Sequence, residues 1–335
     1  MSDAQDQAGE DLLELDYPAW RARMAAIGAE QGFHESLGEA HHAHFVETEG
    51  ATLLVSFESF PAIRALSDSG LPLGAEVAEA QGWSHLAVVS ARDTWFRAPE
   101  IYAFFDQLND DAFFDEFDTI LFYGAGPCGY AACAYSVAAP GARVLALQPQ
   151  ATLDPRATEW DDRFVAMRRT SFTDRYGYAP DMIDAADRAY IAYDPREPLD
   201  AMHAALFARR NVLRLRMPSM GAALQADVIG LDIFRPLLEA AMHGTLDTAA
   251  FGRLLRGRRG YGPYLRRLLA RLDADERPDL AVLLCRNVTN RMRAPRFRKR
   301  LLALEAAGHG RPRARAPEPA EDDADAMPGT AVAGR

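Results

Sequence analysis

The chain has 335 residues, of which 49% are hydrophobic and 25% are charged, and its formal net charge is −11. This length and composition suit one large α/β domain or two smaller ones, and the acidic balance argues against general nucleic-acid binding. Three cysteines without a CxxC pair or any metal-ligand spacing argue against a disulfide framework and a zinc ribbon.

The N-terminal segment MSDAQDQAGEDLLELD is acidic and lacks the apolar core of a signal peptide. No apolar run approaches the ~20 residues needed to cross a bilayer, so the sequence predicts a cytoplasmic protein with no membrane partner. Residues 1–12 and the tail 308–335 have no hydrophobic periodicity. The tail is rich in Pro, Ala and charge, and both ends are predicted to be disordered.

The ordered part of the chain begins with an amphipathic pattern over residues 17–32, which predicts a helix ended by Gly32. Short apolar runs then predict strands at 51–59, 85–91, 119–124, 143–149, 189–194 and 211–217. Helical patterns lie between several of these runs, for example at 100–108 and 199–210. Short apolar strands separated by crossover-length segments indicate an α/β fold, with a mostly parallel sheet covered by helices on both faces.

From about Leu231 the pattern becomes helical only, and Pro236, Pro263, Pro278 and Pro295 stand where helices would start. The sequence therefore predicts an α/β domain over residues 13–230 and an all-helical C-terminal extension over 231–307. The segment 251–300 contains fourteen Arg, one Lys and four acidic residues. It is interpreted as an exposed helical face paired with the acidic body, or as a surface for an anionic partner.

The stretch FDTILFYGAGPCGYAAC (117–133) combines an apolar strand, a glycine turn and a small-residue helix. Gly124, Gly126 and Gly129 match the G-x-G-x-x-G dinucleotide pattern, which also needs an acidic residue at the end of the next strand. That strand ends in Gln148 and Gln150. A nucleotide-dependent enzyme that uses the three glycines as a phosphate loop remains an alternative.

The same strand–turn–helix also resembles the nucleophile elbow of the α/β-hydrolase family, and the resemblance covers roughly residues 50–245 in strand order and spacing. Tyr130-Ala131-Ala132 matches the residues that follow family elbows of the GSSMGGYAA type. On this resemblance, Gly126 stands at the nucleophile position. Asp194, after the strand 189–194, stands where the family places its acid. Ala222, next to Gly221, stands where the family places its histidine.

The resemblance implies an α/β-hydrolase-like fold that keeps one member of the catalytic triad, Asp194, and lacks the other two at Gly126 and Ala222. Without a serine hydroxyl and an imidazole base, no acyl-enzyme can form by the family's mechanism. The sequence therefore favours a non-catalytic α/β-hydrolase-like protein, a pseudoenzyme with a binding or regulatory role. Its partner is an unidentified small molecule or protein, and no cofactor is expected.

Other chemistry remains open as alternatives. Cys128, close to a helix N-terminus that lowers a thiol pKa, would be a displaced nucleophile with His203 as its base. A phosphoadenylyl-sulfate reductase is a further alternative, although its SGGxDS-type loop and ECGxH-type cysteine are absent and Cys285 lies in an apolar helical pattern. The cluster His41, His42 and His44 has no carboxylate or cysteine to complete a metal site, so no metal is predicted.

Overall fold

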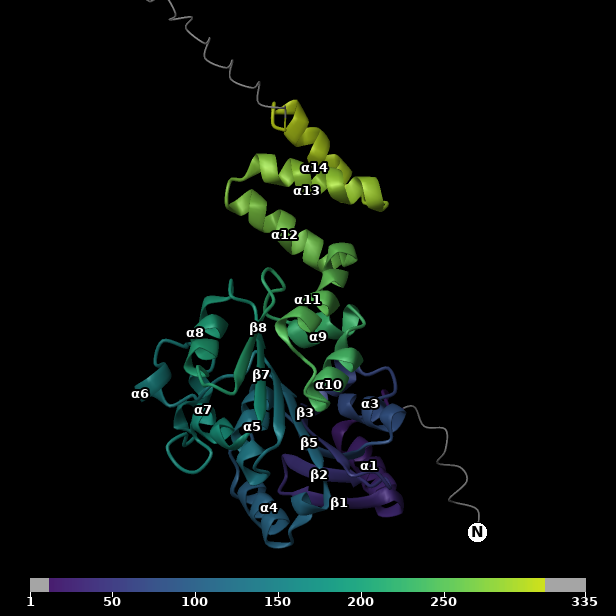
Figure 1. The fold of residues 1–335 in the computed structure, drawn as a ribbon, viewed down its shortest axis with the longest axis vertical. Coiled ribbons are helices and arrows are strands. Elements are labelled where there is room, and N and C mark those ends of the chain that lie inside the picture. Colours follow the sequence, from purple (N-terminus) through teal and green to yellow (C-terminus); the bar gives the residue numbers. More distant parts are fainter. Residues whose placement is uncertain (1–11, 311–335) are drawn as a thin grey trace, which may run out of the picture. The chain divides into compact units, whose positions relative to one another are not determined.

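The structure, a computed structural model, describes residues 12–310 (Figure 1). The termini predicted to be disordered lie almost wholly outside this range, so that prediction remains untested. In the described chain, eight strands form one sheet in the order β1-β2-β4-β3-β5-β6-β7-β8. The strands are β1 (Gly32–Leu37), β2 (His41–Val46), β3 (Thr52–Ser59), β4 (Ser84–Ser90), β5 (Thr119–Ala125), β6 (Arg143–Leu147), β7 (Arg188–Tyr193) and β8 (Val212–Arg216).

Six strands, β3 to β8, run parallel, and β2 is antiparallel to both β1 and β4. The prediction of a mostly parallel sheet is confirmed, and each of the six expected strands is present within one or two residues of its expected ends. The hairpin of β1 and β2 was not predicted. The six parallel strands align their carboxyl ends along one edge of the sheet, where ligand and catalytic groups gather in α/β folds.

Helices cover both faces of the sheet (Figure 1). The α-helices are α1 (Tyr17–Gln31), α2 (Phe60–Leu66), α3 (Leu73–Gln81), α4 (Pro99–Asp110), α5 (Pro127–Tyr135), α6 (Pro155–Thr158), α7 (Ala179–Met182), α8 (Pro198–Leu206), α9 (Leu224–Gly230), α10 (Phe234–Met242), α11 (Thr248–Leu254), α12 (Gly262–Ala274), α13 (Pro278–Arg291) and α14 (Pro295–Ala306). Short 3₁₀ helices are η1 (Phe113–Glu116), η2 (Ser136–Ala138), η3 (Val165–Arg169), η4 (Ile183–Ala185) and η5 (Leu255–Gly260).

The two faces have separate cores because successive strand side chains point to opposite sides. One core joins Val55, Phe57 and Phe122 of the sheet to buried residues of α4, α5 and α8. The other joins Leu54, Leu121 and further strand residues to α3, α9, α10 and α11. Helix α1 packs over β4 at the antiparallel end of the sheet, through a third small cluster. The site at the carboxyl edge thus rests on a rigid, two-sided scaffold.

The described chain divides into two compact units between Leu268 and Leu269, within α12. Between Leu231 and Gly310 the described chain contains helices and no strand, as expected, but the helices up to Leu268 belong to the first unit. Helix α10 explains this, because Leu237, Leu238, Ala241 and Met242 are fully buried in the core on one face of the sheet. The second unit contains α13 and α14, which begin at Pro278 and Pro295 as the proline positions predicted.

Part of the Arg-rich segment is paired inside each unit. In the first unit the guanidinium of Arg267 lies 2.6 Å from the carboxylate of Asp227. In the second, Arg286 pairs with Glu305 at 2.7 Å, and Arg300 with Asp273 at 2.9 Å. These contacts account for some of the positive charge of 251–300, and the two interpretations of this surface both remain predictions.

Within the described residues, no helix is both long enough and apolar enough to span a bilayer.

Candidate functional site at the carboxyl edge of the sheet

The glycine turn forms a sharp strand-to-helix junction. Strand β5 ends at Ala125, Gly126 adopts φ 56° and ψ −123°, and α5 begins at Pro127. The Gly126 N–H donates to the Leu147 carbonyl on β6 at 2.8 Å, and the Gly126 carbonyl accepts from the Tyr130 N–H at 3.0 Å. This backbone conformation strains any residue with a side chain, and the turn therefore has the geometry expected of a nucleophile elbow occupied by glycine.

The three glycines of the turn serve different purposes. A Cβ on Gly124 would lie 2.1 Å from the Cys128 carbonyl oxygen, and one on Gly129 would lie 3.2 Å from the Gly124 and Leu147 carbonyl oxygens. These two glycines allow α5 to lie directly against β5 and β6. A Cβ on Gly126 would meet no atom within 4 Å. The G-x-G-x-x-G spacing is therefore explained by close helix–strand packing, and only Gly126 faces open space.

Asp194 and the loop after β8 come together, as the resemblance implied. The Asp194 carboxylate is buried; its Oδ2 accepts from the Gly221 N–H at 2.7 Å and its Oδ1 from the Arg196 N–H at 2.9 Å. The position aligned with the missing histidine, Ala222, follows Gly221 directly and is exposed. Both carboxylate oxygens of Asp194 thus accept hydrogen bonds from backbone N–H groups of loops. In the mechanism of the α/β-hydrolase family, the acid instead orients the imidazole of the base.

The effect of Pro127 on the turn was not predicted, although the proline is visible in the sequence GAGPCG. In α/β-hydrolases the residue after the nucleophile supplies one backbone N–H of the oxyanion hole. Pro127 occupies that position at the start of α5 and has no N–H to donate. The turn therefore lacks the one oxyanion donor that it would supply, and the Gly126 N–H, bonded to Leu147, is not free to bind a phosphate.

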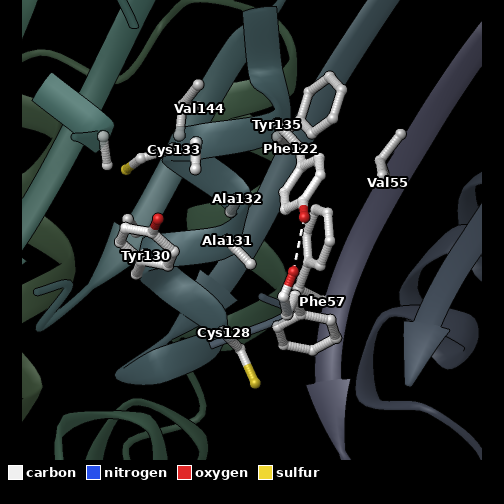
Figure 2. Packing of buried hydrophobic residues seen from close by; sticks show 14 of the residues in the cluster. Val55, Phe57, Phe122, Cys128, Tyr130, Ala131, Ala132, Cys133, Tyr135 and Val144 are labelled. Carbon is white, nitrogen blue, oxygen red and sulfur yellow. Dashed lines mark hydrogen bonds between the residues drawn. The ribbon is translucent and has the colours of Figure 1, made fainter. Parts of the chain in front are cut away.

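Cys128 lies in the first turn of α5, where Figure 2 shows its sulfur apart from that of Cys133. Burial raises the pKa of the Cys128 thiol well above its ordinary value, and the carboxylates of Glu58 and Asp93 raise it further. The N-terminus of α5 was expected to lower this pKa. Desolvation outweighs the helix dipole here, so the group is a neutral thiol near pH 7.

This environment makes the thiols of the native protein unreactive. All three cysteines, Cys128, Cys133 and Cys285, are buried and free. Ellman's reagent should therefore release no chromophore within minutes at pH 8, and three equivalents after addition of guanidinium. One rapidly reacting thiol that disappears in Cys128→Ser would contradict this and restore the displaced-nucleophile alternative.

His203 is committed to a buried polar network. Its Nδ1 accepts from the Ala151 N–H at 3.1 Å, so Nε2 carries the proton and donates to Asp161 at 2.9 Å. Arg163 links Asp161 to Asp200 through contacts of 2.8 and 2.6 Å. Burial lowers the pKa of His203, and the hydrogen bond to Asp161 opposes this effect. Both ring nitrogens thus have protein partners, and neither is left to activate a thiol.

Four of the eight non-glycine residues with positive φ in the described chain lie in loops that directly follow parallel strands. Trp95 and Phe96 after β4, Gln148 after β6 and Ser219 after β8 have φ values between 50° and 65°. Each such non-glycine residue costs about 1–3 kcal/mol and persists only where surrounding contacts hold it. Trp95 and Phe96 are fully buried, so they pack the loop and do not line an open site.

Hydrogen bonds from the side chains of Gln148 and Gln150 hold these loops in place. The Gln148 side chain donates to Asp200 at 2.6 Å and accepts from the Leu224 N–H at 2.9 Å. Gln150 accepts from the Trp95 indole N–H at 3.1 Å. Gln148 and Gln150, which follow β6, therefore form hydrogen bonds with other protein groups. An acidic residue that binds a ribose would instead face the ligand.

A further polar cluster, formed by Ser56, Glu58 and His85, lies on the sheet itself. Ser56 Oγ lies 2.9 Å from His85 Nε2, as in a Ser–His pair, but the Ser56 hydroxyl donates to Glu58 at 2.8 Å. His85 is therefore the donor to Ser56 and cannot act as its base in this arrangement. Glu58 also accepts from the N–H groups of Leu73 and Gly74 at 2.6 and 3.0 Å, the first two N–H groups of α3.

The predicted histidine cluster belongs to β2, where His41, His42 and His44 are all buried. Among the residues that the structure describes, no three or more His, Cys, Asp or Glu side chains are grouped so as to hold a metal ion.

Comparison with known proteins gives fold-level similarity only. No protein-family model matches the chain. No curated protein matches it. Among solved structures, the carboxylesterase EstE1 from a metagenomic library has 13% identity and a TM-score of 0.38, covering 72% of this chain and 98% of its own. An esterase of Pyrobaculum calidifontis has 13% identity and a TM-score of 0.38, covering 76% and 94%. The capsule O-acetyltransferase of Neisseria meningitidis serogroup A has 11% identity and a TM-score of 0.41, covering 61% and 92%. Because all three TM-scores are below 0.5, the description of the fold rests on the sheet and not on these neighbours.

Proposed function

We propose that this chain is an α/β-hydrolase-like protein that does not carry out serine-hydrolase chemistry and acts by binding. The observation that carries the proposal is the glycine turn itself. Gly126 has no nucleophile, and Pro127 has no N–H for an oxyanion. Three functions of an acyl-transfer site, namely nucleophile, base and oxyanion donor, are thus altered at Gly126, Ala222 and Pro127.

The hydrogen bonds of Asp194 support the same proposal. A triad acid receives a hydrogen bond from the imidazole of the base and holds it in the required tautomer. Here the Gly221 N–H donates to the carboxylate instead, at 2.7 Å. The acid thus has a structural use, tying the loop after β8 to the end of β7, that does not depend on a histidine.

The nucleotide-dependent alternative, including the phosphoadenylyl-sulfate reductase, is less well supported by the turn. Phosphate loops present several free backbone N–H groups at a helix N-terminus. The Gly126 N–H is already bonded to Leu147, and Pro127 has none. A thermal-shift screen with NAD, ATP and phosphoadenylyl sulfate should give no stabilisation. A shift with one of them that is lost in Gly126→Val would favour the alternative.

Ester hydrolysis tests the proposal directly. The wild-type chain should hydrolyse p-nitrophenyl acetate and butyrate no faster than the buffer does. Gly126→Ser is the matched variant, because a side chain at this position meets no atom within 4 Å. It should also remain inactive, since the imidazole base and one oxyanion donor are still missing. Turnover by the wild-type chain that is lost in Asp194→Asn would overturn the proposal.

A further inference from the structure

A cavity of about 320 Å³ lies between helices α1 and α3 and the strands β2 and β4. Most of the wall is apolar, including Ile27 of α1, Val46 of β2 and Ala75 of α3. The polar lining residues are His44, His85, Gln31, Thr48 and Glu79. The volume falls in the range of small-molecule sites, which are mostly apolar with a few placed polar groups. None of the lining residues belongs to the glycine turn, so this cavity is independent of the proposed loss of hydrolase chemistry.

The strand register places the two imidazoles next to each other. Val46 pairs with His85, and His44 pairs with Ala87, so the histidines are diagonal neighbours on one face of β2 and β4. Their side chains are 3% and 2% exposed. Buried polar groups in native proteins nearly always have hydrogen-bond partners, and each exception needs an explanation.

Both histidines are such exceptions. In the described part of the chain, His44 Nδ1 and His85 Nδ1 are buried and have no hydrogen-bond partner. The proton of His85 lies on Nε2, because that nitrogen donates to Ser56 while the Ser56 hydroxyl donates to Glu58. His85 Nδ1 is therefore an acceptor without a protein partner, on a side chain that lines the cavity. An acceptor left unpaired in this way costs about 1–3 kcal/mol.

The charge state of the two side chains narrows the ligand class. Burial lowers the pKa of His44 to about 4 and that of His85 to about 3, so both are neutral near pH 7. Neutral imidazoles offer no counter-charge to an anion, and the apolar walls would desolvate any charged group at a high cost in free energy. A neutral ligand with a donor avoids both problems.

We propose that this cavity binds a small uncharged molecule, an apolar ring that carries an O–H or N–H donor, and that the donor pairs with the imidazoles of His44 and His85. Recognition through a buried hydrogen bond rejects an analogue that lacks the donor, since the acceptor is then left unpaired. The site thus distinguishes phenol-like molecules from hydrocarbons of the same shape.

Phenol and toluene form the probe pair, and their binding to the full chain at pH 7.5 can be measured by ligand-observed NMR titration. Phenol should bind at least ten times more tightly than toluene. Ala75→Phe should abolish binding, because Ala75 is a half-buried residue of α3 that lines the cavity. Ala80→Phe, at an exposed position on the same helix, is the control and should bind phenol as the wild type does.

His44→Phe then tests the donor, since it keeps a ring at this position and removes the nitrogen. The phenol-to-toluene preference should fall at least threefold in this variant. Equal binding of phenol and toluene by the wild type would overturn the proposal, as would phenol binding that survives Ala75→Phe. Failure of both phenol and indole to bind at millimolar concentration would also overturn it. If His44→Phe does not fold, the Ala75→Phe and Ala80→Phe pair decides the question.

Discussion

The protein is expected to lose most of its stability between pH 6.5 and pH 5. Five histidines are at most 4% exposed, and in four of them, His41, His42, His44 and His85, the pKa is about 4 or lower. Burial lowers the pKa of His41 and His44 to about 4, of His85 to about 3 and of His42 to about 2. The corresponding value for an exposed histidine is 6.5.

The sign of the effect follows from the lowered pKa values. Below pH 6.5 the unfolded chain takes up protons that the folded chain excludes, so the free energy of unfolding falls as the pH falls. Each fully neutral histidine contributes at most about 1.4 kcal/mol per pH unit. Four of them contribute at most about 5 kcal/mol per unit, against a typical total stability of about 5–15 kcal/mol.

Denaturant unfolding at pH 7.5, 6.5, 5.5 and 5.0 measures this slope. His42→Phe keeps a ring between Trp20 and His34, with which His42 is in aromatic contact, and should reduce the slope by about one proton. His243 is exposed, so His243→Gln is the control and should leave the slope unchanged. A free energy of unfolding that stays constant from pH 7.5 to 5 would show that these histidines are not buried in neutral form.

Gly124→Ala is expected to prevent stable folding. The new methyl group would lie 2.1 Å from the Cys128 carbonyl oxygen, which is backbone and cannot rotate away. Relief requires α5 to move off β5, although every residue of α5 from Cys128 to Tyr135 is buried (Figure 2). Overpacking of this kind costs about 3 kcal/mol or more.

Two glycine variants serve as controls for this prediction. Gly126→Ala meets no atom within 4 Å, so its loss is limited to backbone strain of roughly 1–3 kcal/mol. Gly252→Ala, within α11, also meets no atom and should be neutral or stabilising by about 1 kcal/mol. Circular dichroism and thermal melts rank the three. A Gly124→Ala chain as stable as Gly126→Ala would mean that the glycine turn is not packed as described.

Much of the fold could be predicted because buried parallel strands appear as continuous apolar runs. The run HLAVVSA corresponds to β4, in which every residue is buried. The hairpin of β1 and β2 was missed because its strands contain His34, His41, His42 and His44. Histidines look polar in a sequence, and only their burial in neutral form lets them occupy a strand in the core.

The candidate site was partly predictable. Asp194 and Ala222 were placed through the resemblance to the α/β-hydrolase family, and in the structure Gly221, the neighbour of Ala222, donates to Asp194. The absence of an oxyanion donor at position 127 could have been predicted from GAGPCG, because proline has no N–H. The partnership of His203 with Asp161 could not be read from the sequence, since the two are 42 positions apart and meet only through the tertiary fold. Likewise, no sequence pattern predicts that burial affects the pKa of Cys128 more strongly than the helix dipole does.

The proposed function requires that Gly126 leaves the turn without a nucleophile and that no other serine replaces it. The most direct measurement is the intact mass of the purified chain after incubation with an excess of a fluorophosphonate probe, with an active esterase treated in parallel. The account predicts that the esterase gains the mass of one probe and that this chain gains none. A stoichiometric adduct on a serine of this chain, blocked by prior unfolding, would contradict it and would identify an active hydrolase site.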